Sequence, residues 1–272
     1  MLNPMKILIV GGTSTMAEHC ARLWLKQDNC EMILLGRDEN RLQRVTQDLQ
    51  IRNPNAKISY ETVDFLNPIA IQTCINTISQ EGNIDIALIA HGTLPDQEAC
   101  QNDLTQCQQA IEINAISPVL FAEAIANEML SKNHGKLAVI GSVAGDRGRK
   151  SNYIYGASKA LIDRYMQGLQ HRIGLLGSNV TATLIKPGPT QTPMTAGISG
   201  KGKMATPEQV AKDIVDGIHA NKRVIYTPGK WAIIMMIIRH LPFFIFKKFF
   251  GNGHRLPVLF YNSCVTWQSD TS

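Results

Sequence analysis

Short apolar runs alternate along the chain with longer segments whose apolar residues recur at helical spacing. Seven runs of four to seven residues are rich in isoleucine, valine and leucine, at 7–10, 31–35, 57–63, 84–90, 136–140, 180–185 and 223–226. Such runs are typical of strands buried on both faces. Helices are expected near 16–28, 38–50, 67–81, 105–132, 152–175 and 206–220. The alternation predicts an α/β fold, with a doubly wound parallel sheet of about seven strands.

Composition and charge divide the chain near residue 228. Its 272 residues are 44% hydrophobic and 18% charged, as in ordinary globular proteins. Residues 1–216 carry 20 Lys/Arg and 21 Asp/Glu, whereas residues 217–272 carry seven Lys/Arg and only Asp270. A balanced body with a basic tail argues against nucleic-acid binding by the whole fold. We expect one domain over residues 1–228 and an apolar-basic helical extension over residues 229–272.

The cysteines and the first residues bear on location. Six cysteines are scattered without a CxxC pair, which indicates reduced thiols rather than disulfides or a metal site. The first residues run directly into an apolar strand and do not resemble a secretory signal. Both features predict a cytoplasmic protein.

The first predicted strand ends in a glycine-rich turn, VGGTSTMA at residues 10–17, before the first helix. In such a turn, backbone N–H groups can face a pyrophosphate at the positive end of the helix. An ordinary tight turn is the alternative, but the place of this turn after the first strand favours a Rossmann-type cofactor loop. The residues expected to bind are Gly11, Thr13, Ser14, Thr15 and Met16.

The ends of the next two strands carry a charged residue each. Arg37 follows the second strand, where an acidic residue would bind a ribose 2′-hydroxyl and an arginine can pair with a 2′-phosphate. Arg37 therefore favours NADP over NAD, with a solvated residue at a helix start as the alternative. Asp64 follows the third strand and could accept from the adenine amino group, although an N-cap for the next helix explains it equally well.

A candidate proton-transfer set lies in the second half of the chain. Ser142 follows an apolar strand, and Tyr155 and Lys159 lie four residues apart in a predicted helix. Residues at i and i+4 share one helix face, so a lysine cation can lie beside the phenol and lower its pKa. Such a tyrosine can protonate a carbonyl that receives hydride, while the serine donates to the same oxygen. A surface Tyr–Lys pair is the alternative for this spacing alone.

The order of these motifs resembles the short-chain dehydrogenase/reductase family over residues 6 to about 227. TGxxxGxG of the family falls on residues 10–17, NNAG on 89–92, the helix asparagine on Asn114, YxxxK on 155–159 and PGxxxT on 187–192. The resemblance implies that Tyr155 is the general acid/base, that Lys159 also binds the nicotinamide ribose, that Ser142 polarises the carbonyl, and that Asn114 holds a water. It also implies that Pro187, Gly188, Thr190 and Thr192 flank the nicotinamide.

Two of these motifs depart from the family pattern. Thr15 and Ala17 replace two of the three loop glycines, and Thr15 puts a side chain where backbone should approach phosphate. Its hydroxyl could compensate by donating to a phosphate oxygen. The fourth-strand motif keeps only Gly92, beside His91. A loop histidine without a visible partner is more often structural than catalytic, and we place His91 and Gly92 in the adenosine-supporting part of the cofactor site.

The tail is both apolar and basic. Fifteen of the twenty residues at 231–250 are apolar, but Arg239, His240 and Pro242 interrupt the stretch and disfavour a spanning helix. We expect two short amphipathic helices at a membrane surface through residues 229–255, in preference to a clamp over the substrate cleft or a homo-oligomer interface. The tail and the GGTS loop also resemble reductases of polyprenyl-phosphate-linked 2-keto sugars, which implies a lipid-linked carbonyl substrate at the inner membrane face.

The combined prediction is an NADP(H)-dependent oxidoreductase that interconverts a ketone and a secondary alcohol on a small-molecule or lipid-linked substrate. A non-catalytic NADP-binding sensor or scaffold is the alternative, because of Thr15 and the altered fourth-strand motif. A sugar epimerase or dehydratase shares the Tyr–Lys chemistry but usually needs a larger C-terminal domain than this tail provides.

Overall fold

The structure is a computed structural model that describes residues 4–26, 29–196 and 204–250. Seven parallel strands form one sheet in the order β3-β2-β1-β4-β5-β6-β7. In chain order they are β1 (Met5–Val10), β2 (Cys30–Gly36), β3 (Lys57–Thr62), β4 (Ile86–Ile89), β5 (Lys136–Ile140), β6 (Thr181–Pro187) and β7 (Val224–Thr227). The doubly wound parallel sheet expected from the sequence is confirmed.

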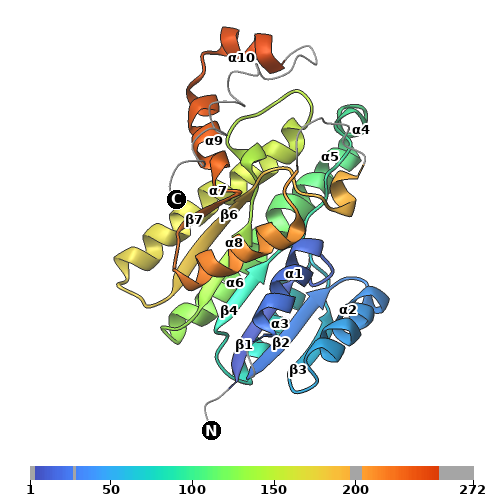
Figure 1. Cartoon of the computed structure of the whole chain (residues 1–272), viewed down its shortest axis with the longest axis vertical. Coiled ribbons are helices and arrows are strands. Elements are labelled where there is room, and N and C mark those ends of the chain that lie inside the picture. The colour runs from blue at the N-terminus through green and yellow to red at the C-terminus, as the bar shows by residue number, and fades with distance from the viewer. Residues whose placement is uncertain (1–3, 27–28, 197–203, 251–272) are drawn as a thin grey trace, which may run out of the picture.

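Helices cover both faces of this sheet (Figure 1). On one face α3 (Pro68–Gln80), α6 (Ser117–Ser131) and α7 (Tyr153–Leu175) pack into one apolar core. On the other face α1 (Thr15–Trp24), α2 (Glu39–Arg52) and α8 (Pro207–His219) pack into a second core. Strands between two apolar cores must be apolar on both faces, which is why the central strands read as continuous hydrophobic runs.

The long helix expected near residues 105–132 is continuous but contains a π-helical segment. The structure has α4 (Gln97–Asn102), α5 (Leu104–Ile111), a π-helical segment (Glu112–Ile116) and then α6. Pro118 lies near the start of α6, and in a regular α-helix its ring would clash with the carbonyl of Asn114 four residues earlier. The wider π turn relieves this clash and places Asn114 in a locally irregular segment.

The strand order fixes where a ligand can bind. From β1 the chain proceeds outward through β2 and β3, and then returns to place β4 on the other side of β1. In doubly wound sheets a crevice opens at such a switch point, beyond the carboxyl ends of the two strands. The glycine-rich turn after β1 and the His91-Gly92 turn after β4 both lie at this edge.

Two helices follow β7, α9 (Lys230–His240) and α10 (Phe243–Phe250), and they are separated at Pro242. Figure 1 shows them at one end of the molecule, beyond the strand ends that carry the site. Among the described helices, none combines the length and the apolar composition that a bilayer crossing requires. Cys264 and the 251–255 part of the expected membrane-contact segment lie outside the described residues.

Candidate active site

A cavity of about 290 Å³ lies at the switch point between β1 and β4. It brings together nine of the residues that the sequence assigned to a cofactor: Gly11, Thr13, Ser14, Thr15, Met16, Arg37, His91, Gly92 and Thr192. These residues come from four separate loops, so only the folded sheet gathers them.

The turn after β1 depends on Gly11. Its φ is +86°, and a Cβ there would lie 2.7 Å from the backbone nitrogen of His91. Only glycine therefore allows the β1 and β4 turns to approach this closely. Helix α1 begins at Thr15, and its N-cap Ser14 forms no side-chain capping bond within the described residues. The first N–H groups of α1 are thus available to an anion in the cavity.

Two arginines face the far end of the cavity. Arg37 at the end of β2 and Arg41 in the first turn of α2 both line it, and both side chains are exposed. Sequence reasoning identified Arg37 and missed Arg41, which lies in the first turn of α2, four residues beyond Arg37.

Asp64 lies in a neighbouring hollow with Arg37, Thr62 and Val63 rather than in the main cavity. Its carboxylate accepts from the backbone N–H of Leu66 at 2.9 Å, and α3 is capped by Asn67 instead. The N-cap interpretation of Asp64 is therefore wrong. A capping residue directly precedes the first helical residue, which is Pro68, and that position belongs to Asn67.

His91 is packed into the base of the cavity. Its Nε2 lies 2.9 Å from the hydroxyl of Ser117, and its ring meets that of Phe65 edge-on at 4.7 Å. Burial, together with the nearby Lys159 cation, lowers the pKa of His91 to about 3, so the ring is neutral at physiological pH. A neutral histidine held on two sides fits a supporting role better than proton transfer.

Ser142, Tyr155 and Lys159 meet where β5 adjoins α7. Ser142 follows β5 and caps a 3₁₀ turn (Val143–Gly145), accepting from the N–H of Ala144 at 3.1 Å. The buried Lys159 donates to the carbonyl of Ile140 at 3.1 Å, and its Nζ lies 5.7 Å from the centre of the Tyr155 ring. These contacts attach one face of α7 to the end of β5.

The pKa values in this group differ from the sequence expectation. Burial raises the pKa of Tyr155, and the hydrogen bond with Ser142 opposes that rise. Burial also lowers the pKa of Lys159 to about 8. Burial is the largest influence on the pKa of Tyr155 and Ser142 supplies the opposing interaction, so the influence of Lys159 on the pKa of Tyr155 stays a prediction.

Asn114 is fully buried and ties its helix to the turn after β4. Its Oδ1 accepts from the N–H of Thr93 at 2.8 Å, and its Nδ2 donates to the carbonyl of Ala110 at 2.9 Å. A Cβ on Gly92 would lie 2.9 Å from that Oδ1 and 3.5 Å from the Nζ of Lys159. Gly92 therefore permits the close approach of Asn114 and Lys159.

The segment after β6 only partly reaches the cavity. Thr192 lines it, whereas Thr190 is buried and donates to the carbonyl of Gly188 at 3.0 Å. Pro187 ends β6, and Gly188 contacts Trp231 of α9, so that a Cβ there would lie 1.9 Å from the indole nitrogen. The structure thus separates Thr192 from the other three residues predicted in this segment.

Sequence reasoning also missed several lining residues. They are Gly36, Phe65, Leu66, Ala90, Thr93, Ile113, Ser117, Pro193 and Met194. Several of them adjoin predicted residues and share their strand ends, which was the available signal. Ser117 lines the cavity directly after the π segment, which no sequence pattern indicated.

The tail is attached to the loop that follows Ser142. Met235, Ile238 and Phe246 form a small apolar cluster with Val143. Arg147 donates to the carbonyls of Ile238 and Leu241 at 2.5 and 2.6 Å, and its guanidinium lies 4.0 Å from the centre of the Phe246 ring. An arginine at the C-terminal end of a helix satisfies carbonyls that lack intrahelical partners.

Comparisons with known proteins agree with this geometry. The model of the short chain dehydrogenase family matches residues 5–202. An uncharacterised oxidoreductase of Streptomyces coelicolor is 28% identical over 249 residues, covering 90% of this chain and 96% of its own. Another, from Mycobacterium tuberculosis, is 29% identical over 245 residues, covering 89% and 96%. The short-chain dehydrogenase from Sphingobium yanoikuyae in complex with NADPH superposes with a TM-score of 0.74 at 20% identity, covering 88% of this chain and 97% of that one.

The chain therefore belongs to the short-chain dehydrogenase family of oxidoreductases, and the family expected from its motifs is confirmed.

Proposed function

We propose that the protein uses NADP(H) to interconvert a ketone and a secondary alcohol, with Tyr155 as the general acid/base. The observation that carries this proposal is the meeting of Ser142, Tyr155 and Lys159 at the sheet edge that also bears the cavity. A phenol that hydrogen bonds with Ser142, with a buried lysine one helical turn away, is a proton donor suited to a carbonyl oxygen.

The cavity fits a dinucleotide with a 2′-phosphate. The close turn at Gly11 and the free N-terminus of α1 suit a pyrophosphate, and the Thr15 hydroxyl could donate to one of its oxygens. Arg37 and Arg41 place two positive charges at the cavity rim, where a 2′-phosphate can accept from them. Similarity to NADPH-bound short-chain dehydrogenases supports the same cofactor.

Each residue then has one task during reduction. When bound, NADPH supplies the hydride that adds to the carbonyl carbon. Ser142 donates a hydrogen bond to the carbonyl oxygen as negative charge develops there. Tyr155 gives its phenolic proton to the same oxygen, which completes the alcohol. Lys159 holds the nicotinamide ribose and stabilises the resulting phenolate, and Asn114 shapes the path by which the phenolate is reprotonated.

Tyr155→Phe tests this mechanism. Removing one hydroxyl should lower turnover by ~10²–10⁴-fold, the range of general acid catalysis, while NADPH affinity and the melting temperature stay near wild type. Tyr153→Phe is the matched control, because Tyr153 is 41% exposed and lies on the same first turn of α7. Retention of near-wild-type turnover by Tyr155→Phe on a panel of ketones would refute the mechanism. Binding of NADPH without turnover by the wild type would favour the non-catalytic sensor or scaffold.

For the substrate and its location we propose a lipid-linked carbonyl compound presented at an anionic membrane surface. Phe243, Phe244, Ile233 and Met236 expose 73, 67, 55 and 51% of their surface on α9 and α10, beside exposed Arg239, Lys247 and Lys248. No Asp or Glu occurs in residues 217–250. An apolar face bordered by basic residues complements an anionic headgroup layer. Because the buried side of α9 covers the loop after Ser142, a membrane at its exposed side would lie near the site.

Vesicle sedimentation tests this surface. The wild type should co-sediment more with vesicles that contain phosphatidylglycerol than with vesicles of phosphatidylcholine alone. A Phe243→Glu/Phe244→Glu variant should stay in the supernatant. Leu104→Glu is the control, since Leu104 is 82% exposed on α5. Equal sedimentation of both variants would refute the proposal. If the wild type ignores vesicles but the double variant changes from dimer to monomer in light scattering, the face is an oligomer interface.

A further inference from the structure

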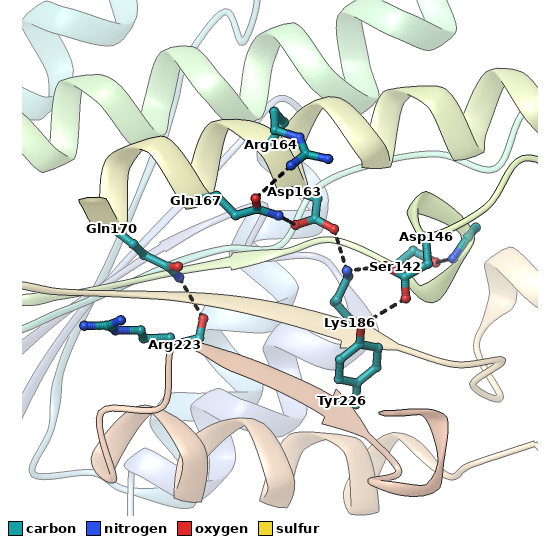
Figure 2. A network of polar contacts seen from close by, with 10 residues as sticks. Ser142, Asp146, Asp163, Arg164, Gln167, Gln170, Lys186, Arg223 and Tyr226 are labelled. Carbon is teal, nitrogen blue, oxygen red and sulfur yellow. Dashed lines mark hydrogen bonds and ion pairs between the residues drawn. The ribbon is translucent and has the colours of Figure 1, made fainter. Parts of the chain in front are cut away.

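A second group of buried charges lies beside the candidate active site. Lys186, in β6, is 3% exposed, and its ammonium contacts the carboxylates of both Asp146 and Asp163, the latter at 2.5 Å. The hydroxyl of Tyr226 in β7 donates to the other oxygen of Asp146 at 3.0 Å. Figure 2 shows Lys186 between the loop that carries Asp146 and the helix that carries Asp163.

Each member belongs to an element that also bears a proposed catalytic residue. Asp146 directly follows the 3₁₀ turn capped by Ser142. Asp163 lies on α7, one turn beyond Lys159 and two turns beyond Tyr155. Lys186 therefore joins the serine turn to the tyrosine helix through two carboxylates, at the strand residue that precedes Pro187.

The buried Lys186 ammonium is compensated by the two carboxylates that it contacts. Burial alone would lower the pKa of Lys186, but hydrogen bonds with the two carboxylates raise it, so the ammonium persists. Apolar side chains of similar size would fill such a space without the desolvation cost of three charges, and buried ion groups are often retained because they select one arrangement of the surrounding elements. The elements that this ion group holds together are the turn that carries Ser142 and helix α7, which carries Tyr155.

We propose that Lys186 and Asp146 are positioning residues that hold Ser142 in hydrogen-bonding register with Tyr155. The inference rests on the proposed function, since it concerns the proton transfer assigned to Tyr155. Without the Lys186–Asp146 contact, the turn that carries Ser142 keeps its packing on α7, where Gly156 adjoins the Ala144 carbonyl, and its outer contact through Arg147, but Lys186 of β6 no longer holds its end. The Ser142–Tyr155 hydrogen bond then weakens, and that bond is the interaction that opposes the raised pKa of Tyr155.

Asp146→Asn is the informative variant. It removes one carboxylate and leaves Lys186 paired with Asp163, so no buried charge remains uncompensated. We expect kcat to fall ~10–100-fold through misplacement of Ser142, with NADPH affinity within about twofold of wild type. In alcohol oxidation, where Tyr155 must be deprotonated, the rate rises with pH through the apparent pKa of Tyr155. Weakening the Ser142 bond raises that pKa, so this rising limb should move to higher pH.

A double-mutant cycle separates positioning from a general structural effect. In a Ser142→Ala background, Asp146→Asn should cause little further loss of kcat and no further shift of the pH limb. Asp216→Asn is the matched control, because Asp216 forms an exposed ion pair with Lys212 at 2.5 Å on α8 and should leave kcat and the limb unchanged. Tyr226→Phe removes a single hydroxyl and should produce a smaller shift in the same direction, even if Asp146→Asn fails to fold.

Two results would overturn the inference. One is that both Asp146→Asn and Tyr226→Phe keep the wild-type kcat and the wild-type pH dependence of alcohol oxidation. The other is an Asp146→Asn loss that is equally large with and without Ser142, which would indicate a purely structural role. Failure of the proposed function is distinguishable, because Tyr155→Phe would then match the wild type.

Discussion

Replacing Arg37 with alanine should weaken NADPH binding and leave NADH binding unchanged. The Arg37 side chain is exposed at the cavity rim, and among the described residues it forms no ion pair that its loss would disrupt. Its removal creates no internal cavity in the core. A change in affinity can therefore be attributed to the missing contact with a ligand phosphate.

The magnitude follows from the exposure of the side chain. A hydrogen bond to a charged group contributes about 1.5–3 kcal/mol, and solvent screening at an exposed site favours the lower value. Because ~1.4 kcal/mol corresponds to a factor of ten, Arg37→Ala should raise the Kd for NADPH about tenfold. NADH lacks the 2′-phosphate, so its Kd should change by less than about twofold. Arg41→Ala should cause a loss of the same sign, because Arg41 lines the same end.

Fluorescence titration with NADPH and NADH measures both constants. Arg44→Ala is the control, since Arg44 is exposed on α2 with Arg41, does not line the cavity, and donates to the carbonyl of Asn40 at 3.3 Å. The wild-type preference for NADPH should also decrease as salt increases. Equal weakening of both cofactors in Arg37→Ala, or no weakening of either, would refute the role of Arg37 in phosphate recognition.

Three further changes test other contacts. A Cβ at Gly92 would lie 2.9 Å from Oδ1 of Asn114, so Gly92→Ala should lower kcat ~10–100-fold in steady-state assays while the melting temperature falls little. Because burial lowers the pKa of Lys159 to about 8, its ammonium is present below that pH and lost above it. NADPH affinity should therefore decrease as pH rises through about 8, and a Lys159→Met variant with the same profile would contradict this assignment. Gly188→Ala places a Cβ 1.9 Å from the indole nitrogen of Trp231 and should destabilise the fold by ~1–3 kcal/mol in chemical denaturation; the loss should vanish in a Trp231→Ala background.

The sequence predicted the sheet because the central strands carry an unambiguous signal. β1, β4 and β5 are short and apolar on both faces, and they alternate with helices of clear period. The long helix at 105–132 was predicted with nearly its observed bounds, but its π-helical segment was missed, since the apolar period continues through residues 112–116. The steric conflict between Pro118 and the preceding helical turn depends on backbone geometry, which the spacing of apolar residues does not reveal.

The candidate site divides in the same way. Gly11, Tyr155 and Lys159 could be found because their spacing within single segments defines them. Arg41 and Ser117 could not be found with equal certainty, because their place at the cavity depends on how a helix starts or widens. The direction of the pKa of Tyr155 was also beyond the sequence, since desolvation depends on the atoms that surround the phenol.

The amino-acid order by itself determined the strand sequence, the turn at Gly11 and the four-residue spacing of Tyr155 and Lys159, because these depend on neighbours along one segment. Only the tertiary structure decided which distant groups meet. Lys186 contacts Asp146 and Asp163, 40 and 23 residues away in the chain, because β6 lies between the serine loop and α7. Burial in that position depends on packing from several elements at once, and no spacing along the sequence specifies it.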